Sequence, residues 1–179
     1  MLVLLAALAV GLWAGAVAGG RLANIQYLKL RQPWFVLLAL GLQLVVFSPL
    51  SPHLGTAAVV TLHLLSYALL IAFAVLNRHN TGVLITAAGV ACNALAITLN
   101  AGYMPATRGA LRTAGQLYTG DTSNNSRLAE HGARLLLLGD VMAVPHALPL
   151  ANVFSIGDVL VAGGVAILLA GAMLAQPRG

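Results

Sequence analysis

The chain has 179 residues, of which 60% are hydrophobic and only 7% are charged, and its mean hydropathy is +0.93. Soluble globular domains carry roughly 25% charged residues, so this composition excludes that class. The formal charge of +5 comes from nine Lys and Arg against four Asp and Glu. In a membrane protein such an excess reports orientation and contact with anionic lipids, and we expect no nucleic-acid partner.

The apolar segments predict an all-α fold: a polytopic membrane helix bundle of about five transmembrane helices, forming a single domain over residues 1–179. A helix needs about 20 apolar residues to cross a bilayer, and the chain has room for about five such helices. A large connection over residues 100–155 remains. The expected spans are residues 2–18, 34–47, 56–76, 83–99 and 156–175.

The first span contains Gly11, Gly15 and Gly19, a four-residue spacing that lets two helices approach closely in lipid. Residues 19–32 then alternate basic and apolar side chains at helical spacing, which predicts an interfacial amphipathic segment on the cytoplasmic side. Residues 48–53 form an uncharged turn broken by prolines, expected on the outer side.

Polar side chains inside the second and third spans are candidates for hydrogen bonds between helices or for a site. Gln43 lies in the second span, and His63 and Ser66 share one face of the third with Tyr67 beside them. His63 and Ser66 are candidate substrate-binding residues, with a structural hydrogen bond as the alternative. The other histidines fall in connections, so we expect no haem. Cys92 is the one cysteine, which excludes a CxxC metal or redox site, and we expect no other cofactor and no metal.

The fourth span carries Asn93 and Asn100 on one inward face. It ends at Asn100–Pro105 (NAGYMP), where Tyr103 sits at interface depth. Asn100 and Tyr103 are therefore further candidates for binding a substrate. The pattern of residues 106–117 allows one short helix.

The end of the large connection is too short and too interrupted to span a bilayer. Residues 135–138 are predicted to end a re-entrant or interfacial helix, and the prolines after them indicate irregular chain. Asn152 and Ser155 are expected to cap the last span. Asn152 is also a candidate binding residue.

Basic residues in short connections predict the orientation: the N-terminus and the large connection outside, the C-terminus in the cytoplasm. The four arginines of the large connection weaken this count, but long loops follow charge less strictly. The basic residues then placed inside are Arg21, Lys29, Arg31, Arg78 and Arg178.

Asp140 and Asp158 stand in matching Gly-Asp pairs and are two of only four acidic residues. Two carboxyls close together in a low-dielectric site share a proton, and such a pair can act as general base and general acid on a water. This makes them the candidate catalytic residues, with Asn100 and Asn152 as expected hydrogen-bond donors to them. The alternatives are a helix-terminus role for each aspartate, or a pair that binds an ion, lipid headgroup or substrate.

Several motifs together resemble an uncharacterised family of small bacterial integral-membrane proteins. The resemblance covers nearly the whole chain and implies a bacterial plasma-membrane protein without a known activity. The motifs are Gly19–Arg21, Asn77–His79, Asn100–Pro105, Leu138–Asp140 and Asn152–Asp158.

The acidic segments are also similar in site type to lipoprotein signal peptidase, a membrane aspartyl protease. That family has an Asn-x-Gly segment, an Asp at a helix end and an Asn-containing segment opening its last helix, in the order of Asn100, Asp140 and Asn152–Asp158. This chain departs from the family because no Arg follows Asp140 and the two spans between the first motifs are missing.

Three classes of function remain open. The first is a membrane-embedded hydrolase, or a binder of a membrane-anchored peptide or lipid, at the outer face. The second is a small transporter or lipid-handling protein that uses the polar interior around His63. The third is a non-catalytic subunit that packs on partner membrane subunits.

Overall fold

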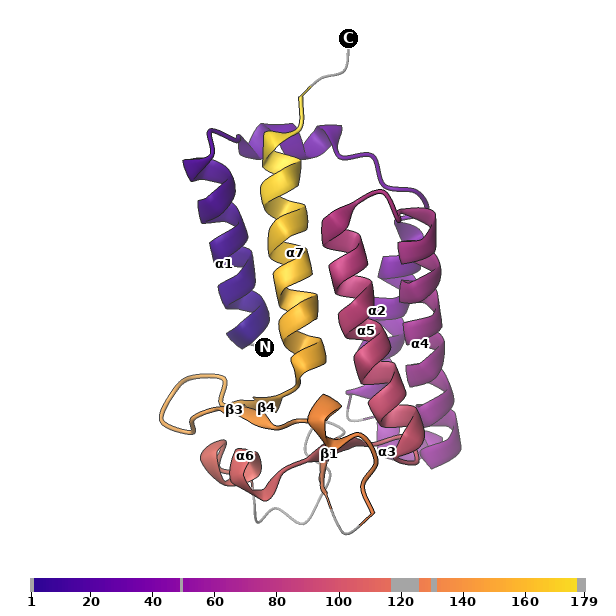
Figure 1. Cartoon of the computed structure of the whole chain (residues 1–179). Helices are drawn as coiled ribbons and strands as arrows, with labels where there is room; N and C mark the ends of the chain where they lie inside the picture. Colours follow the sequence, from indigo (N-terminus) through magenta and orange to yellow (C-terminus); the bar gives the residue numbers. More distant parts are fainter. Residues whose placement is uncertain (1, 49, 117–125, 130–131, 177–179) are drawn as a thin grey trace.

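The computed structural model describes residues 2–176 except 49, 117–125 and 130–131. Its long helices run side by side, and a layer of short elements crosses one end of them (Figure 1). The predicted all-α fold class is thereby confirmed. The long helices are α1 (Leu2–Val17), α2 (Trp34–Val46), α4 (Thr56–Leu76), α5 (Thr81–Leu99) and α7 (Ile156–Leu174).

Three of these helices, α4, α5 and α7, are long and apolar enough to cross a membrane. The other two, α1 and α2, are also apolar but have 16 and 13 residues. A straight span needs about 20 residues, so these two are short for a full crossing. The five helices almost coincide with the five spans predicted from the sequence.

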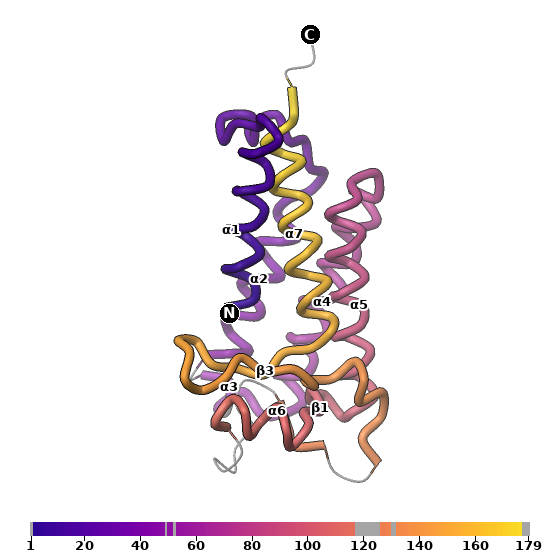
Figure 2. Tube along the Cα trace, turned by 60° about the vertical axis from the view of Figure 1, so that its left-hand side comes forward, coloured from indigo at the N-terminus to yellow at the C-terminus, as the bar shows by residue number. Residues whose placement is uncertain are grey.

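The last helix of the chain lies between the first helix and the middle ones. Contacts run from α1 to α7, from α7 to α5, from α5 to α4 and from α4 to α2. Figures 1 and 2 show α7, in yellow, beside α1 and next to α5. The start of α7, which carries Asp158, is therefore surrounded by elements distant in sequence.

Glycines bring α5 and α7 into backbone contact. A Cβ atom on Gly89 would lie 2.4 Å from the carbonyl oxygen of Gly157, and one on Gly164 would lie 2.5 Å from the backbone nitrogen of Thr86. Both distances are too short for a side chain. Helices in lipid associate through such close packing because no hydrophobic force drives them together there.

The predicted small-residue stripe of α1 also packs inside the chain. A Cβ atom on Gly11 would lie 2.7 Å from the carbonyl oxygen of Ala166 in α7, and one on Gly15 would lie 2.7 Å from the sulfur of Met173. Gly19 has no heavy atom near its Cβ position. The stripe therefore binds α7 rather than presenting a surface for another subunit.

Opposite the layer of short elements, the turn end of the bundle consists of residues 18–33 and 77–80. The segment predicted to be interfacial and amphipathic contains a short 3₁₀ helix, η1 (Leu22–Tyr27), followed by non-helical chain. Asn80 starts α5 by accepting a hydrogen bond from the backbone nitrogen of Val83. At the other end, the predicted proline-broken turn contains one short helix, α3 (Ser51–Leu54).

Residues 100–155 form the layer across the other end, called the loop layer below. Its two small sheets pair β1 in parallel with β2 and β3 antiparallel with β4. The predicted short helix in this connection is confirmed as α6. The elements are β1 (Met104–Ala106), α6 (Arg108–Thr113), β2 (Ser126–Leu128), η2 (Leu136–Leu138), β3 (Met142–Val144) and β4 (Asn152–Phe154).

Two features of the loop layer differ from the expectation. The segment predicted to end a re-entrant or interfacial helix is a single 3₁₀ turn, η2, which follows Leu135 at a φ of +51°. A residue at positive φ cannot continue a right-handed helix into the turn. The segment that contains the two prolines is irregular as predicted, but it connects two strands that were not predicted, β3 and β4, in which Met142 faces Phe154.

Candidate functional site

Asp158 stands in the first turn of α7 and holds the start of that helix. The Ser155 hydroxyl accepts a hydrogen bond of 3.0 Å from the backbone nitrogen of Asp158, and the Ser155 nitrogen donates one of 2.9 Å to Asp158 Oδ2. This reciprocal capping box satisfies two backbone donors that a helix start leaves free. It is the helix-terminus role that the sequence left open for Asp158. Asn152, also expected as a cap, does not take part.

A buried asparagine from α5 completes this cluster. Asn93 Nδ2 donates a hydrogen bond of 2.8 Å to Asp158 Oδ1, and Asn93 Oδ1 accepts one of 2.8 Å from the Ser155 hydroxyl. Asn93 and Ser155 are buried, and Asp158 is half-buried. Both carboxylate oxygens of Asp158 are therefore engaged in fixed hydrogen bonds, which hold the side chain in one orientation.

Asp140 lies in the loop layer beside β1. Its backbone nitrogen donates a hydrogen bond of 2.8 Å to the oxygen of Pro105, and its backbone oxygen accepts one of 3.1 Å from the nitrogen of Thr107. The end of the NAGYMP segment is thus hydrogen-bonded directly to the backbone of Asp140. Asp140 is only 5% exposed, and its carboxyl accepts a hydrogen bond from the Ser126 hydroxyl.

The pKa of Asp140 is raised from 3.8 to about 6, mainly by burial; the Ser126 hydrogen bond lowers it, and the negative charge of Asp158 adds a smaller rise. A carboxyl transferred out of water loses solvation of its charged form, which explains the sign of the main effect. The carboxyl therefore titrates close to neutral pH.

The two aspartates are neighbours with separate partners. Among the residues that the structure describes, no hydrogen bond joins them, and Asp140 uses Ser126 whereas Asp158 uses Asn93 and Ser155. In the described part of the chain, the negative charge of Asp158 still acts on Asp140, whose pKa it helps to raise.

The prediction that Asn100 and Asn152 donate hydrogen bonds to the aspartates is wrong. Asn100 Nδ2 donates to the oxygens of Ala96 and Arg134, and Asn100 Oδ1 accepts from the nitrogen of Arg134 at 2.9 Å. Asn100 therefore fastens the end of α5 to the loop layer. Asn152 Oδ1 accepts a hydrogen bond of 3.2 Å from Gln116.

The intramembrane candidates form a second cluster, between α2 and α4. His63 and Ser66 are buried, and the Ser66 hydroxyl donates to the His63 oxygen at 2.7 Å. Gln43 Nε2 donates to the Ser66 hydroxyl at 3.3 Å, which confirms the predicted hydrogen bond between helices. The His63 ring lies 4.8 Å from the Tyr67 ring and 5.4 Å from the Phe47 ring, between centroids.

Tyr103 lies in the loop layer and contacts a cation. The guanidinium carbon of Arg127 is 3.2 Å from the centroid of the Tyr103 ring. This cation–π contact links the NAGYMP segment to β2, whose Ser126 holds Asp140. Tyr103 thus supports the surroundings of Asp140.

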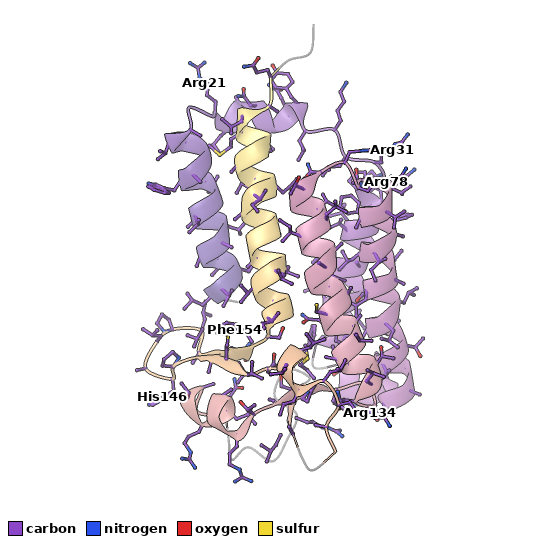
Figure 3. All side chains as sticks on the ribbon, in the orientation of Figure 1. Arg21, Arg31, Arg78, Arg134, His146 and Phe154 are labelled. Carbon is purple, nitrogen blue, oxygen red and sulfur yellow. The ribbon has the colours of Figure 1, made fainter. Side chains whose placement is uncertain are left out.

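A cavity of about 240 Å³ adjoins the Asp158 cluster. Asp158 and Asn152 contribute its polar wall, and the first turn of α1 contributes apolar side chains. Phe154, labelled in Figure 3 where β4 leads into α7, also lines this cavity. The apolar lining consists of Leu2, Val3, Leu4, Val144, Leu150, Val153, Phe154 and Val161.

The sequence contained a signal for part of this cluster. Ser155 and Asp158 have the Ser-x-x-acid spacing of a capping box, and Asn93 was placed on the inward face of its helix. Ser126 carried no signal, because a serine in a polar connection is typical of any loop. In the part of the chain that the structure describes, no three His, Cys, Asp or Glu side chains gather as a metal site.

A family model described as a family of unknown function, DUF5317, matches residues 27–170. The matched region contains every residue of the two aspartate clusters and excludes α1. No curated protein and no solved structure matches the chain.

Proposed function

We propose that this chain, which belongs to DUF5317, a family of unknown function, is a bacterial plasma-membrane protein that binds a membrane-anchored amphiphile at the outer face. The observation that carries the proposal is the cavity of about 240 Å³ beside Asp158. It joins a fixed carboxylate to apolar walls at the end of a bundle in which α4, α5 and α7 are long and apolar enough to cross a membrane.

The polar wall selects the head of the ligand. Asp158 is half-buried, and Asn93 and Ser155 hold its carboxylate in place. A fixed carboxylate that still faces a cavity matches a positively charged or hydrogen-bond-donating group, such as the amino group of a lipid or a lipidated peptide. The hydrogen bonds from Asn93 and Ser155 reduce the reorganisation needed when such a group arrives.

The apolar wall matches a hydrocarbon chain. Leu2, Val3 and Leu4 line the cavity from α1, and Val161 lines it from α7. Ligand sites of this kind combine an apolar lining with a few polar groups that fix orientation. The tail of the ligand would leave the cavity between α1 and α7 and enter the bilayer.

The orientation belongs to the same proposal. The start of α1 and the loop layer lie at one end, and the C-terminal end of α7 lies at the other (Figure 1). The short connections at the turn end carry Arg21, Lys29, Arg31 and Arg78. Basic residues in short connections favour the cytoplasm, so the Asp158 cavity would face outward. Arg178, counted with them from the sequence, lies outside the described residues.

Binding of a long-chain alkylamine to the detergent-solubilised protein tests this function, with the alcohol of equal length as the uncharged comparison. The wild type should bind the amine roughly tenfold more tightly, since a hydrogen bond between charged groups contributes about 1.5–3 kcal/mol. Asp158→Asn should remove this preference and keep the fold, because an amide can still cap α7.

A pair of α1 variants tests the apolar wall. Val3→Phe should weaken binding of both ligands by filling the cavity, whereas Leu5→Phe, at an exposed position of the same helix, should not. Equal affinity of the wild type for amine and alcohol, or an unchanged preference in Asp158→Asn, would refute the proposed function.

A second candidate, hydrolysis by an aspartyl-type mechanism, is favoured by the pKa of about 6 at Asp140. Such a carboxyl can exchange protons near neutral pH. Water would add across an amide: its oxygen bonds to the carbonyl carbon, the C–N bond breaks, and the nitrogen leaves as an amine after protonation. Because the two aspartates have separate hydrogen-bond partners and no hydrogen bond joins them among the described residues, we rank this candidate below binding.

Mass spectrometry of lipidated peptides incubated with the protein in liposomes separates the two candidates. A hydrolase would give products that carry one added water, and Asp140→Asn would abolish them. Intact peptides at every pH between 5 and 8 would eliminate hydrolysis and leave the binding proposal standing.

The remaining alternatives have weaker support. A non-catalytic subunit needs a free small-residue surface, yet Gly11 and Gly15 already pack on α7. A transporter needs an accessible polar interior, yet His63 does not line the cavity beside Asp158.

A further inference from the structure

A second cavity, of about 350 Å³, lies among α2, α4, α5 and α7 toward the turn end of the bundle. It is separate from the cavity beside Asp158, and the two share no lining residue. The side chains around it are almost all apolar. They include Leu30, Val36, Phe73, Val83, Ala87 and Leu168.

The chemistry of the lining excludes water as a stable occupant. Thr86 is the one polar side chain of the lining, and its hydroxyl donates a hydrogen bond of 2.9 Å to the oxygen of Gly82. A buried water needs two to four polar partners, which these walls do not offer. A cavity of this composition among membrane-spanning helices therefore suits a hydrocarbon chain.

The cavity is accessible from the side of the bundle. Leu37 of α2 lines it and is 56% exposed, so the wall at α2 is in contact with the surroundings of the helices. In a bilayer those surroundings are lipid chains. The acyl chain of a lipid can thus enter between α2 and its neighbours without crossing the loop layer.

Positive charges stand at the mouth of this cavity. Leu30, which lines it, lies between Lys29 and Arg31 in the chain, and Figure 3 shows Arg31 and Arg78 at the turn end. Asn77, which precedes Arg78, is hydrogen-bonded to the backbone of Arg31. The lysine and both arginines are exposed. The first acidic residue in the sequence is Asp121, so the half of the chain that builds this end contains no carboxylate side chain.

Asn77 fixes the position of Arg31 relative to the cavity. Its side-chain oxygen accepts a hydrogen bond of 2.7 Å from the Arg31 nitrogen, and its amide donates one of 2.9 Å to the Arg31 oxygen. The amide also donates to the oxygen of Phe73, a cavity-lining residue, at 2.8 Å. Asn77 is only 7% exposed. The basic segment is therefore anchored at the cavity mouth by the last turn of α4.

We propose that this cavity and its basic rim bind one anionic phospholipid, with an acyl chain between α2 and α5 and the phosphate at Arg31 and Arg78. Lys29 adds a third positive charge that attracts the negatively charged headgroup. Arginine suits this task because its fork of N–H donors matches the oxygens of a phosphate. The proposal is independent of the ligand at Asp158, which would bind at the opposite end.

Native mass spectrometry of the purified full chain tests the proposal, using mixed micelles with equal amounts of phosphatidylglycerol and phosphatidylcholine. The wild type should retain one phosphatidylglycerol preferentially. Arg31→Gln and Arg78→Gln should each lower that retention roughly fivefold, since a basic residue near an anionic lipid surface contributes about 1 kcal/mol. Arg21→Gln is the matched control, because Arg21 lies at the same end over α1 (Figure 3).

A second pair of variants tests the acyl-chain position. Ala87→Phe should lower retention of both lipids by filling the cavity, whereas Ala88→Phe, at the adjacent exposed position, should leave it unchanged. Thermal unfolding checks that both variants fold, and Ala87→Leu replaces Ala87→Phe if the larger residue does not. Equal retention of the two lipids by the wild type, an equal effect of Arg21→Gln, or full retention in folded Ala87→Phe or Ala87→Leu would each overturn the proposal.

Discussion

Asn93 on α5 donates a hydrogen bond of 2.8 Å to the carboxylate of Asp158 on α7, 65 positions later in the chain. The same amide accepts a hydrogen bond from Ser155, the residue that caps α7. One side chain therefore connects the carboxylate, the cap and the neighbouring helix. The cavity beside Asp158 depends on this connection because it sets where the carboxylate points.

Asn93→Ala should lower the free energy of unfolding by about 1–3 kcal/mol, since it leaves the buried Ser155 hydroxyl without its acceptor and one Asp158 carboxylate oxygen without its donor. Thermal unfolding in detergent measures the effect. Thr98→Ala is the control on the same helix, because Thr98 is exposed and bonds only within its own helix. An Asn93→Ala variant as stable as Thr98→Ala would show that the Asn93 hydrogen bonds contribute little.

Adjacent glycines of α7 should respond in opposite ways to alanine. Gly164→Ala places a methyl group 2.5 Å from the Thr86 nitrogen and must separate α5 from α7, whereas Gly163 has no heavy atom near its Cβ position. We expect a clear loss of thermal stability for Gly164→Ala. Gly163→Ala should be neutral or stabilising by up to about 1 kcal/mol, because alanine favours a helix over glycine. Equal melting temperatures for the two variants would contradict the observed helix contact.

Reporter fusions test the orientation on which the proposed outer site depends. A reporter active only in the cytoplasm should be active when fused after Asn80 and inactive when fused after Ala114, because the short basic connections favour the inside. A reporter active only outside should give the reverse pattern. Cytoplasmic activity of the Ala114 fusion would place both aspartate clusters on the inner side.

The sequence was sufficient to predict the helices but not the loop layer. Long apolar runs can only be helices in lipid, so the bounds of α4 and α7 follow closely from composition. The β1–β2 and β3–β4 pairs have three residues in each strand. Strands that short give no recognisable alternation of polar and apolar residues, and their pairing depends on contacts distant in sequence.

The candidate site was also predicted only in part, because its local contacts can be inferred from the sequence and its contacts between distant elements cannot. The capping role of Ser155 and Asp158 is local, so spacing alone indicates it. The partners that determine each carboxyl's surroundings, Asn93 and Ser126, come from other elements. Asn100 and Asn152 were expected in their place because they are nearer in the sequence motifs, although the fold directs both amides elsewhere.

The stability of the protein should depend on pH through Asp140. The pKa of this carboxyl rises from 3.8 to about 6 on burial, so the folded state binds a proton more tightly than the unfolded state. The contribution of Asp140 to the free energy of unfolding is therefore fully present below about pH 4 and is lost as the pH rises through about 6. The pKa shift corresponds to a decrease in the free energy of unfolding of up to about 3 kcal/mol.

Asp140→Asn should remove this pH dependence and leave the variant at least as stable as the wild type at pH 7. The amide carries no charge at any pH, and its oxygen can still accept the hydrogen bond from Ser126. Asp158→Asn is the control: it should retain most of the dependence, because burial is the larger cause of the shift and the charge of Asp158 a smaller one. Thermal unfolding in detergent from pH 4 to pH 8 measures all three proteins. Wild-type stability that stays constant or increases from pH 4 to pH 7, with Asp140→Asn following the same curve, would contradict a buried carboxyl that titrates near pH 6.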